Sequence, residues 1–81
     1  MNTENIKTRE DFIKFAKELS QNYKDHKQEW ENNKLDLFLD AMATYSNDVQ
    51  GYYKNWHPEV SADIPSWRVF ADILKGSTLY E

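Results

Sequence analysis

The longest amphipathic stretch, residues 33–56, constrains the fold most. Its apolar residues recur at alternating intervals of three and four positions, the spacing that places side chains on one face of an α-helix. These residues are Leu35, Phe38, Met42, Tyr45, Val49, Tyr52 and Trp56. A helix with a continuous apolar stripe is unstable alone in water, because the stripe must be buried against other segments. The pattern therefore predicts a helix over 33–56 with the rest of the chain packed on it.

A first covering helix is predicted over residues 8–24. Thr8 and Asp11 form an acidic variant of the capping box, in which each residue caps a backbone amide of the other. The segment has apolar side chains at helical spacing, namely Phe12, Phe15, Ala16, Leu19 and Tyr23. Between this helix and the long one, a short helical turn near 26–31 is expected to carry Trp30 inward. Asn33 is expected to cap the long helix.

A second covering helix is predicted over residues 66–75. Ser66 is a favoured N-cap residue, and Gly76 is typical of a helix C-terminus. The apolar face consists of Trp67, Phe70, Ala71, Ile73 and Leu74. His57-Pro58 ends the long helix, since the residue before proline is disfavoured in the α region. In the loop 58–65 that follows, Val60 and Ile64 are expected to point inward.

The expected fold is all-α, a small bundle of three main helices in a single domain of residues 1–81. Strict two-residue alternation is absent, and with 2 glycines and 2 prolines the chain has too few turn signals for a many-stranded β fold. Residues 1–7 are expected to fray, and the tail 77–81 to fold back through Leu79 and Tyr80. Gly51 costs about 1 kcal/mol in a helix interior. Either a backbone or ring packs against it or the helix ends near it, and the phase of Tyr52 and Trp56 favours a continuous helix.

The charge distribution favours a basic partner over nucleic acid. The net charge is −4, and residues 35–81 carry all of it, with three basic and seven acidic residues. Such a surface repels phosphate backbones. The chain has 0 cysteines, and neither a membrane span nor a signal peptide is visible. These features predict a soluble, cytoplasmic protein.

The aromatic residues of the second half are the best candidates for a partner-binding surface. Tyr and Trp combine a large apolar body with a polar edge and are enriched at protein interfaces. The predicted contact residues are Asp48, Tyr52, Tyr53, Trp56 and Trp67. Tyr52 and Tyr53 are adjacent and point about 100° apart on a helix, so one of them must face outward. We expect this to be Tyr53.

A divalent-metal site or hydrolase is the alternative. Asp36, Asp40 and Asp48 recur on one side of the long helix, and Asp72 on the next helix is the cross-helix candidate. Helix bundles with such sites usually add Glu-x-x-His motifs, which are absent here. The acidic residues are therefore better interpreted as a solvated face, and no metal or other cofactor is predicted.

Catalytic signatures are also missing from the sequence. His26 and His57 lie in connecting segments, without a serine or aspartate at a spacing that marks a nucleophile and its base. Phosphate-binding glycine loops and zinc-ligand spacings are absent as well. The sequence therefore favours a protein that is not an enzyme.

Several motifs resemble a family of small bacterial proteins of unknown function. They are W-E-N (30–32), F-L-D-A-M (38–42), D-x-x-G-Y-Y-K-N (48–55), P-S-W-R-V-F-A-D-I-L (65–74) and the terminal Y-E (80–81). The resemblance covers residues 8–81 and implies a bacterial domain. It implies no activity, cofactor or catalytic residue, and it draws attention to Asp48, Gly51, Tyr52, Tyr53, Trp67 and Asp72.

Three hypotheses follow from the sequence. The first is a non-enzymatic protein-binding module with an acidic, aromatic surface, for instance an immunity-type protein that masks a basic toxin. The second is the metal-binding bundle or hydrolase. The third is a homodimer that buries the remaining aromatic surface on itself. The expected oligomeric state is a monomer or a weak homodimer.

Overall fold

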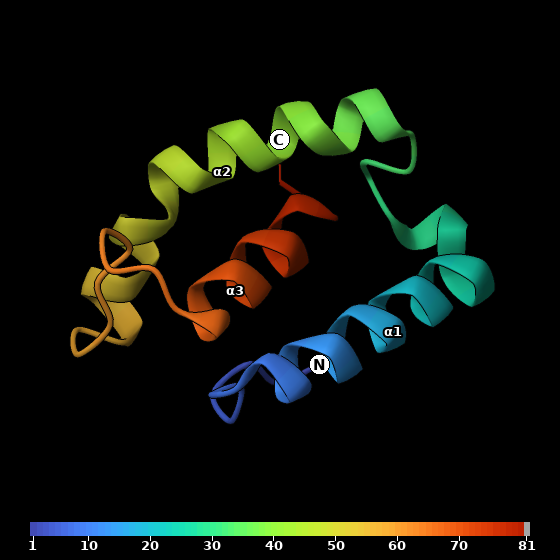
Figure 1. Ribbon diagram of the computed structural model, residues 1–81. Helices are drawn as coiled ribbons and strands as arrows, with labels where there is room; N and C mark the ends of the chain where they lie inside the picture. The colour runs from blue at the N-terminus through green and yellow to red at the C-terminus, as the bar shows by residue number, and fades with distance from the viewer. Residues whose placement is uncertain (81) are drawn as a thin grey trace.

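The computed structural model, which describes residues 1–80, is all-helical and contains no strand within them (Figure 1). In chain order the elements are α1 (Arg9–His26), the short 3-10 helix η1 (Lys27–Glu29), α2 (Leu35–Trp56) and α3 (Trp67–Ser77). The predicted fold class is confirmed, and each main helix begins and ends within two residues of its predicted bounds. Glu81 of the terminal Tyr-Glu motif lies outside the described residues.

The three main helices form one flat layer with α3 in the middle. α1 and α2 run in opposite directions on either side of α3, and α2 arches over it (Figure 1). Both outer helices pack against α3 and not against each other. The layer measures 33 × 27 × 18 Å. Because α3 separates the outer helices, each broad side of the molecule has a space between α1 and α2.

Two of the three helix starts follow the predicted capping. The Oγ1 of Thr8 accepts from the Asp11 amide at 3.1 Å, and the Asp11 carboxylate accepts from the Thr8 amide at 3.1 Å. The amides of Lys7 and Thr8, which both donate to this carboxylate, hold the pKa of Asp11 below its ordinary value. The Oγ of Ser66 likewise accepts from the Val69 amide at 3.1 Å.

The predicted cap of the long helix at Asn33 is wrong. The N-cap residue is Lys34, whose side chain makes no capping hydrogen bond. Asn33 instead stabilises the corner between α1 and α2, where its carbonyl accepts from the Tyr23 hydroxyl at 2.6 Å. The corner also encloses Trp30, as predicted: its ring lies between Tyr23 and Phe38, with centroids 5.0 and 5.9 Å away.

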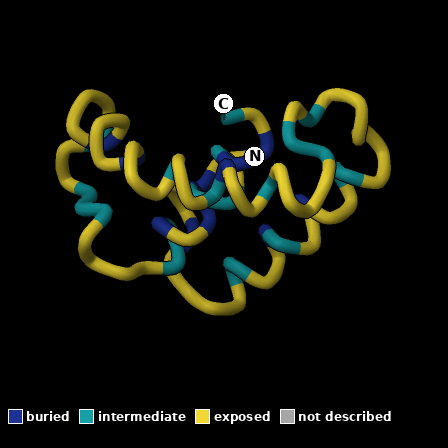
Figure 2. Tube along the Cα trace, turned by 90° about the horizontal axis from the view of Figure 1, so that it is seen from above, coloured by how far each residue is buried: buried dark blue, intermediate teal, exposed yellow. Residues whose placement is uncertain are grey.

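Buried residues form two small clusters toward the middle of the layer, and the outer turns are exposed (Figure 2). One cluster, on the α1 side, contains Ile6, Phe15, Leu19 and Ala71. The other, on the α2 side, contains Val49, Tyr53 and Val69. α3 therefore contributes to both clusters and joins them.

The apolar stripe of α2 is buried only in part. Leu35 is 75% exposed and Trp56 is 72% exposed, although both belong to the stripe that was predicted to be covered; Trp56 was also predicted to contact a partner. The reason is length: α3 has 11 residues, whereas α2 has 22. At about 1.5 Å per residue, α3 reaches along only half of α2 and leaves both ends of the stripe uncovered.

The expectation that residues 1–7 fray is at odds with the structure. Ile6 belongs to the α1-side cluster, and Thr3 is also buried. The Thr3 hydroxyl donates to the carboxylate of Asp72 on α3. This segment therefore packs on the core, and Thr3 supplies one of the hydrogen-bond donors that the buried carboxylate of Asp72 requires.

Smaller predictions had mixed outcomes. Val60 packs inward as expected, but Ile64 is 67% exposed because a turn, in which its amide donates to the Ser61 carbonyl at 3.3 Å, directs it outward. The tail folds back through Tyr80, which packs on Tyr45 with ring centroids 4.9 Å apart, whereas Leu79 is 62% exposed. Gly76 lies inside α3 and does not end it.

Candidate functional site

The structure separates the predicted partner-binding residues, and Tyr53 is the clearest correction. Tyr53 is fully buried, while Tyr52 is 42% exposed, so the expectation that Tyr53 faces outward is wrong. Tyr53 follows Val49 by four residues and continues the buried face of α2. Its hydroxyl donates to Oδ2 of Asp72 at 2.5 Å. Tyr53 therefore cannot contact a partner in this conformation.

Asp72 is the centre of a buried polar network. It accepts hydrogen bonds from Tyr53 and Thr3, and the Nε of Arg68 lies 3.7 Å from its carboxylate. Burial and then the hydrogen bond to Asp72 raise the pKa of Tyr53 above its ordinary value, which keeps the hydroxyl protonated as a donor. The Nε of Arg68 is buried without a hydrogen-bond partner among residues 1–80. The network joins α2, α3 and the N-terminal segment.

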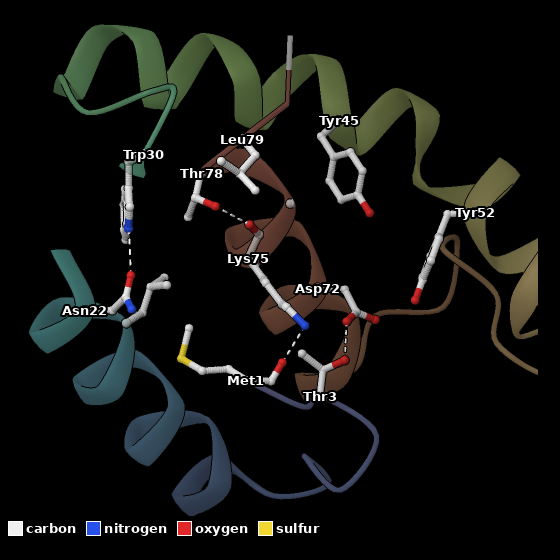
Figure 3. Close-up of a pocket in the computed structure, with 12 residues that line it drawn as sticks. Met1, Thr3, Asn22, Trp30, Tyr45, Tyr52, Asp72, Lys75, Thr78 and Leu79 are labelled. Atoms are coloured by element: carbon white, nitrogen blue, oxygen red, sulfur yellow. Dashed lines mark hydrogen bonds between the residues drawn. The ribbon is translucent and has the colours of Figure 1, made fainter. Parts of the chain in front are cut away.

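A cavity of about 370 Å³ opens beside this network on one broad side of the layer. The rings of Tyr45 and Tyr52 extend into it from α2, and Asp72 and Lys75 line it from α3 (Figure 3). Lys75 donates to the carbonyl of Met1, so the N-terminal segment forms one wall. Burial is the main reason why the pKa of Tyr45 is raised, and the negative charge of Asp72 adds to this effect. The charged groups of this cavity thus bind the chain itself.

A second feature lies at the C-terminal end of α2 and is here called the aromatic corner. It consists of Tyr52, Trp56 and His57 together with Glu4 of the N-terminal segment and Glu59 of the loop. The rings of Tyr52 and His57 lie 5.7 Å apart. The imidazole of His57 lies 3.9 Å from the Glu4 carboxylate and 3.8 Å from that of Glu59. Trp56 is the last residue of α2 and is 72% exposed. An exposed indole therefore stands one residue before His57, to which two exposed carboxylates lie close.

The other two predicted contact residues lie elsewhere. Asp48 is exposed on α2 and accepts from the hydroxyl of Tyr80. Trp67 is half-buried where α3 meets α1, with Phe12 and Phe70 at ring centroid distances of 5.4 and 5.7 Å. Trp67 therefore mainly serves packing between helices.

The four carboxylates of the metal-site alternative do not form a site together. Asp36 and Asp40 are exposed on α2, Asp48 is bound by Tyr80, and Asp72 is buried in its own network. Within residues 1–80, no three His, Cys, Asp or Glu side chains come together as ligands would. The arrangement therefore gives the metal-site hypothesis no support.

The chain was compared with known families, proteins and structures. The model of a family of unknown function, DUF7660, matches residues 8–81. The chain belongs to this family. No curated protein and no solved structure gives a significant match. The DUF7660 match includes Tyr53, Asp72 and most of the aromatic corner, whereas Thr3 and Glu4 precede it.

This DUF7660 chain also has an apolar groove, which the sequence reasoning missed. The groove encloses about 450 Å³ between α1 and α2, with Leu74 of α3 on its floor. Ala16, Ser20 and Tyr23 line one wall, and Leu35 and Phe38 line the other. Leu35 was assigned to the buried stripe, so its exposure became evident only from the short reach of α3.

Within residues 1–80, this DUF7660 chain has no helix that combines the length and the apolar content needed to cross a bilayer.

Proposed function

We propose that the protein is a non-enzymatic binding module that contacts a basic protein partner through the aromatic corner. The observation that carries the proposal is the position of Trp56, at the free end of α2 and 72% exposed. Tryptophan is among the residues that contribute most binding energy at protein interfaces. An indole left this open in a small domain is suited to fill a pocket on another protein.

Charge supports a basic partner. Glu4 and Glu59 border the corner with side chains 57% and 63% exposed. The C-terminal end of α2, where Trp56 stands, adds the negative end of the helix dipole. Complementary charges of this kind accelerate association and exclude like-charged partners.

An immunity-type protein that masks a basic toxin is one concrete form of this proposal, set in a bacterial cytoplasm. The excess of acidic residues in 35–81 and the absence of cysteine suit such a role. In this form the module needs no catalytic group, because its effect is to cover the surface of its partner.

The test is capture of the partner by the purified chain from native lysate, with identification by mass spectrometry. A partner bound through the corner should be retained by the wild type and lost with Trp56→Ala. Binding should weaken steeply between about 0.05 and 0.5 M salt, because exposed charges are screened at a high ionic strength.

Leu37→Ala is the matched control, since Leu37 is 42% exposed but lies near the opposite end of α2. It should retain the same partner. The proposal is overturned if Trp56→Ala retains every protein that the wild type captures, or if the protein lost with Trp56→Ala is acidic.

A further inference from the structure

On the broad side of the layer that contains the apolar groove, the apolar surface extends beyond the groove itself. Leu39 follows Leu35 by one turn of α2, and Phe70 precedes Leu74 by one turn of α3, so each extends the groove along its helix. Ile13 does the same on α1, three residues before Ala16. The residues of this open face are Ile13, Ala16, Ser20, Tyr23, Leu35, Phe38, Leu39, Phe70 and Leu74.

Four large side chains of the open face are accessible to solvent. Leu35 is 75% exposed, Leu39 50%, Ile13 44% and Phe70 42%. They come from all three helices: Leu35 lines the groove, and the other three lie three or four residues from groove-lining residues on the same helix. Contiguous apolar surface of this kind on a small protein marks an interaction site.

The charges beside the open face differ in sign between its two edges. On α1, Lys17 and Lys24 follow Ile13 and Ser20 by one turn each and are exposed. On α2, the exposed Asp36 lies three residues before Leu39, and the exposed Asp40 follows one turn later. Lys34, the exposed N-cap of α2, also lines the groove, so the α1 edge is basic and the α2 edge is predominantly but not wholly acidic.

This pattern is complementary to itself. A two-fold axis parallel to α3 would place the α1 edge of one copy over the α2 edge of the other, so lysines face aspartates at both edges. α1 ends and α2 begins at the same end of the layer (Figure 1), and Lys24 lies in the last turn of α1 while Asp36 lies in the first turn of α2. A two-fold axis across the helices would oppose like charges instead.

We infer that the open face is a homodimer interface, in which a second copy of this chain buries the leucines of α2 and pairs the two charged edges. A broad side of 33 by 27 Å is large enough for the roughly 800 Å² that each partner contributes to a standard interface. None of the residues of the open face belongs to the aromatic corner.

Sedimentation equilibrium over a concentration series up to about 1 mM measures the association, because that range populates even a millimolar complex. The wild type should show a monomer–dimer equilibrium. Leu39→Ser should weaken it about tenfold or more, because a leucine no longer enters the interface. Leu37→Ser is the matched control: Leu37 is 42% exposed and two residues away, on the other side of α2, and its variant should associate as the wild type does.

Two charge reversals test the orientation. Lys17→Asp with Lys24→Asp makes both edges acidic, and Asp36→Lys with Asp40→Lys makes both edges basic, so each double variant alone should be monomeric. An equimolar mixture of the two should form a heterodimer. A wild type that is monomeric throughout the series, or that dimerises equally well with Leu39→Ser, overturns the inference and leaves the open face to a different protein.

Discussion

The ring of Tyr45 in α2 occupies the space that a side chain at position 76 of α3 would need. A Cβ at Gly76 would lie 2.5 Å from Cζ of Tyr45 and 2.6 Å from its Cδ2, and closer still to Cε2. The same ring contacts Tyr80 from the folded-back tail, with centroids 4.9 Å apart. Gly76 therefore allows close contact between α2 and α3 and fixes the position of the tail.

Gly76→Ala should lower the free energy of unfolding. Overpacking of this kind costs about 1–3 kcal/mol, which outweighs the gain of about 1 kcal/mol from replacing glycine in a helix. Urea unfolding followed by circular dichroism measures the difference. Tyr45 would have to leave its contact with Tyr80, so the tail should become less protected from hydrogen exchange as well.

Gly51→Ala is the matched control and should have the opposite sign. Gly51 lies inside α2, and a Cβ there would meet nothing within 4 Å. The variant should be more stable by about 0.5–1 kcal/mol, because alanine loses less conformational entropy in a helix than glycine does. Equal destabilisation by both substitutions would contradict the role assigned to Tyr45.

Tyr53→Phe should destabilise the fold by about 1–3 kcal/mol, the cost of leaving a buried acceptor without its donor. Asp72 would then lose one of its two hydroxyl donors while remaining buried. Thermal and urea unfolding both report this change.

Tyr52→Phe supplies the comparison at the neighbouring position. Tyr52 is 42% exposed, so water can hydrate the site of its hydroxyl. Its loss should change the free energy of unfolding by less than about 0.5 kcal/mol. If Tyr52→Phe were the more damaging of the two, the assignment of Tyr53 to the core would be wrong.

The stability of the fold should fall in alkaline solution in a way that depends on Tyr53. Burial and the bond to Asp72 raise the pKa of Tyr53 in the folded state above the value of 10.0 for a free tyrosine. Its contribution is therefore intact below about pH 10 and is lost as the pH rises further, since only the unfolded state releases the proton readily. Unfolding of wild type and Tyr53→Phe between about pH 8 and 11 should show their difference shrinking.

Local signals predicted the helices well. The capping box at Thr8 and the serine at 66 marked two helix starts, and His57-Pro58 marked the end of α2. These signals act within a few residues, so they do not depend on the tertiary fold. The N-cap residue of α2 was misassigned, because the carbonyl of Asn33 accepts a hydrogen bond from Tyr23 and Lys34 stands at the N-cap position instead.

The candidate sites could be predicted only in part. The exposed Trp56 was assigned to a partner surface, but Tyr53 was assigned to it wrongly, and the open face was not found. Periodicity places Tyr52 and Tyr53 on adjacent sides of the same helix and cannot tell which side meets α3. The acceptor that holds Tyr53, Asp72, is 19 residues away in the chain.

The sequence alone determined that the chain forms helices, where they begin and end, and which faces are apolar. The tertiary structure decided how much of each face is covered. α3 is half as long as α2 and lies between the outer helices, so it buries Val49 and Tyr53 and leaves Leu35 and Trp56 open. Coverage depends on the reach and position of a neighbouring helix, which no local pattern records, and both proposed contact surfaces result from it.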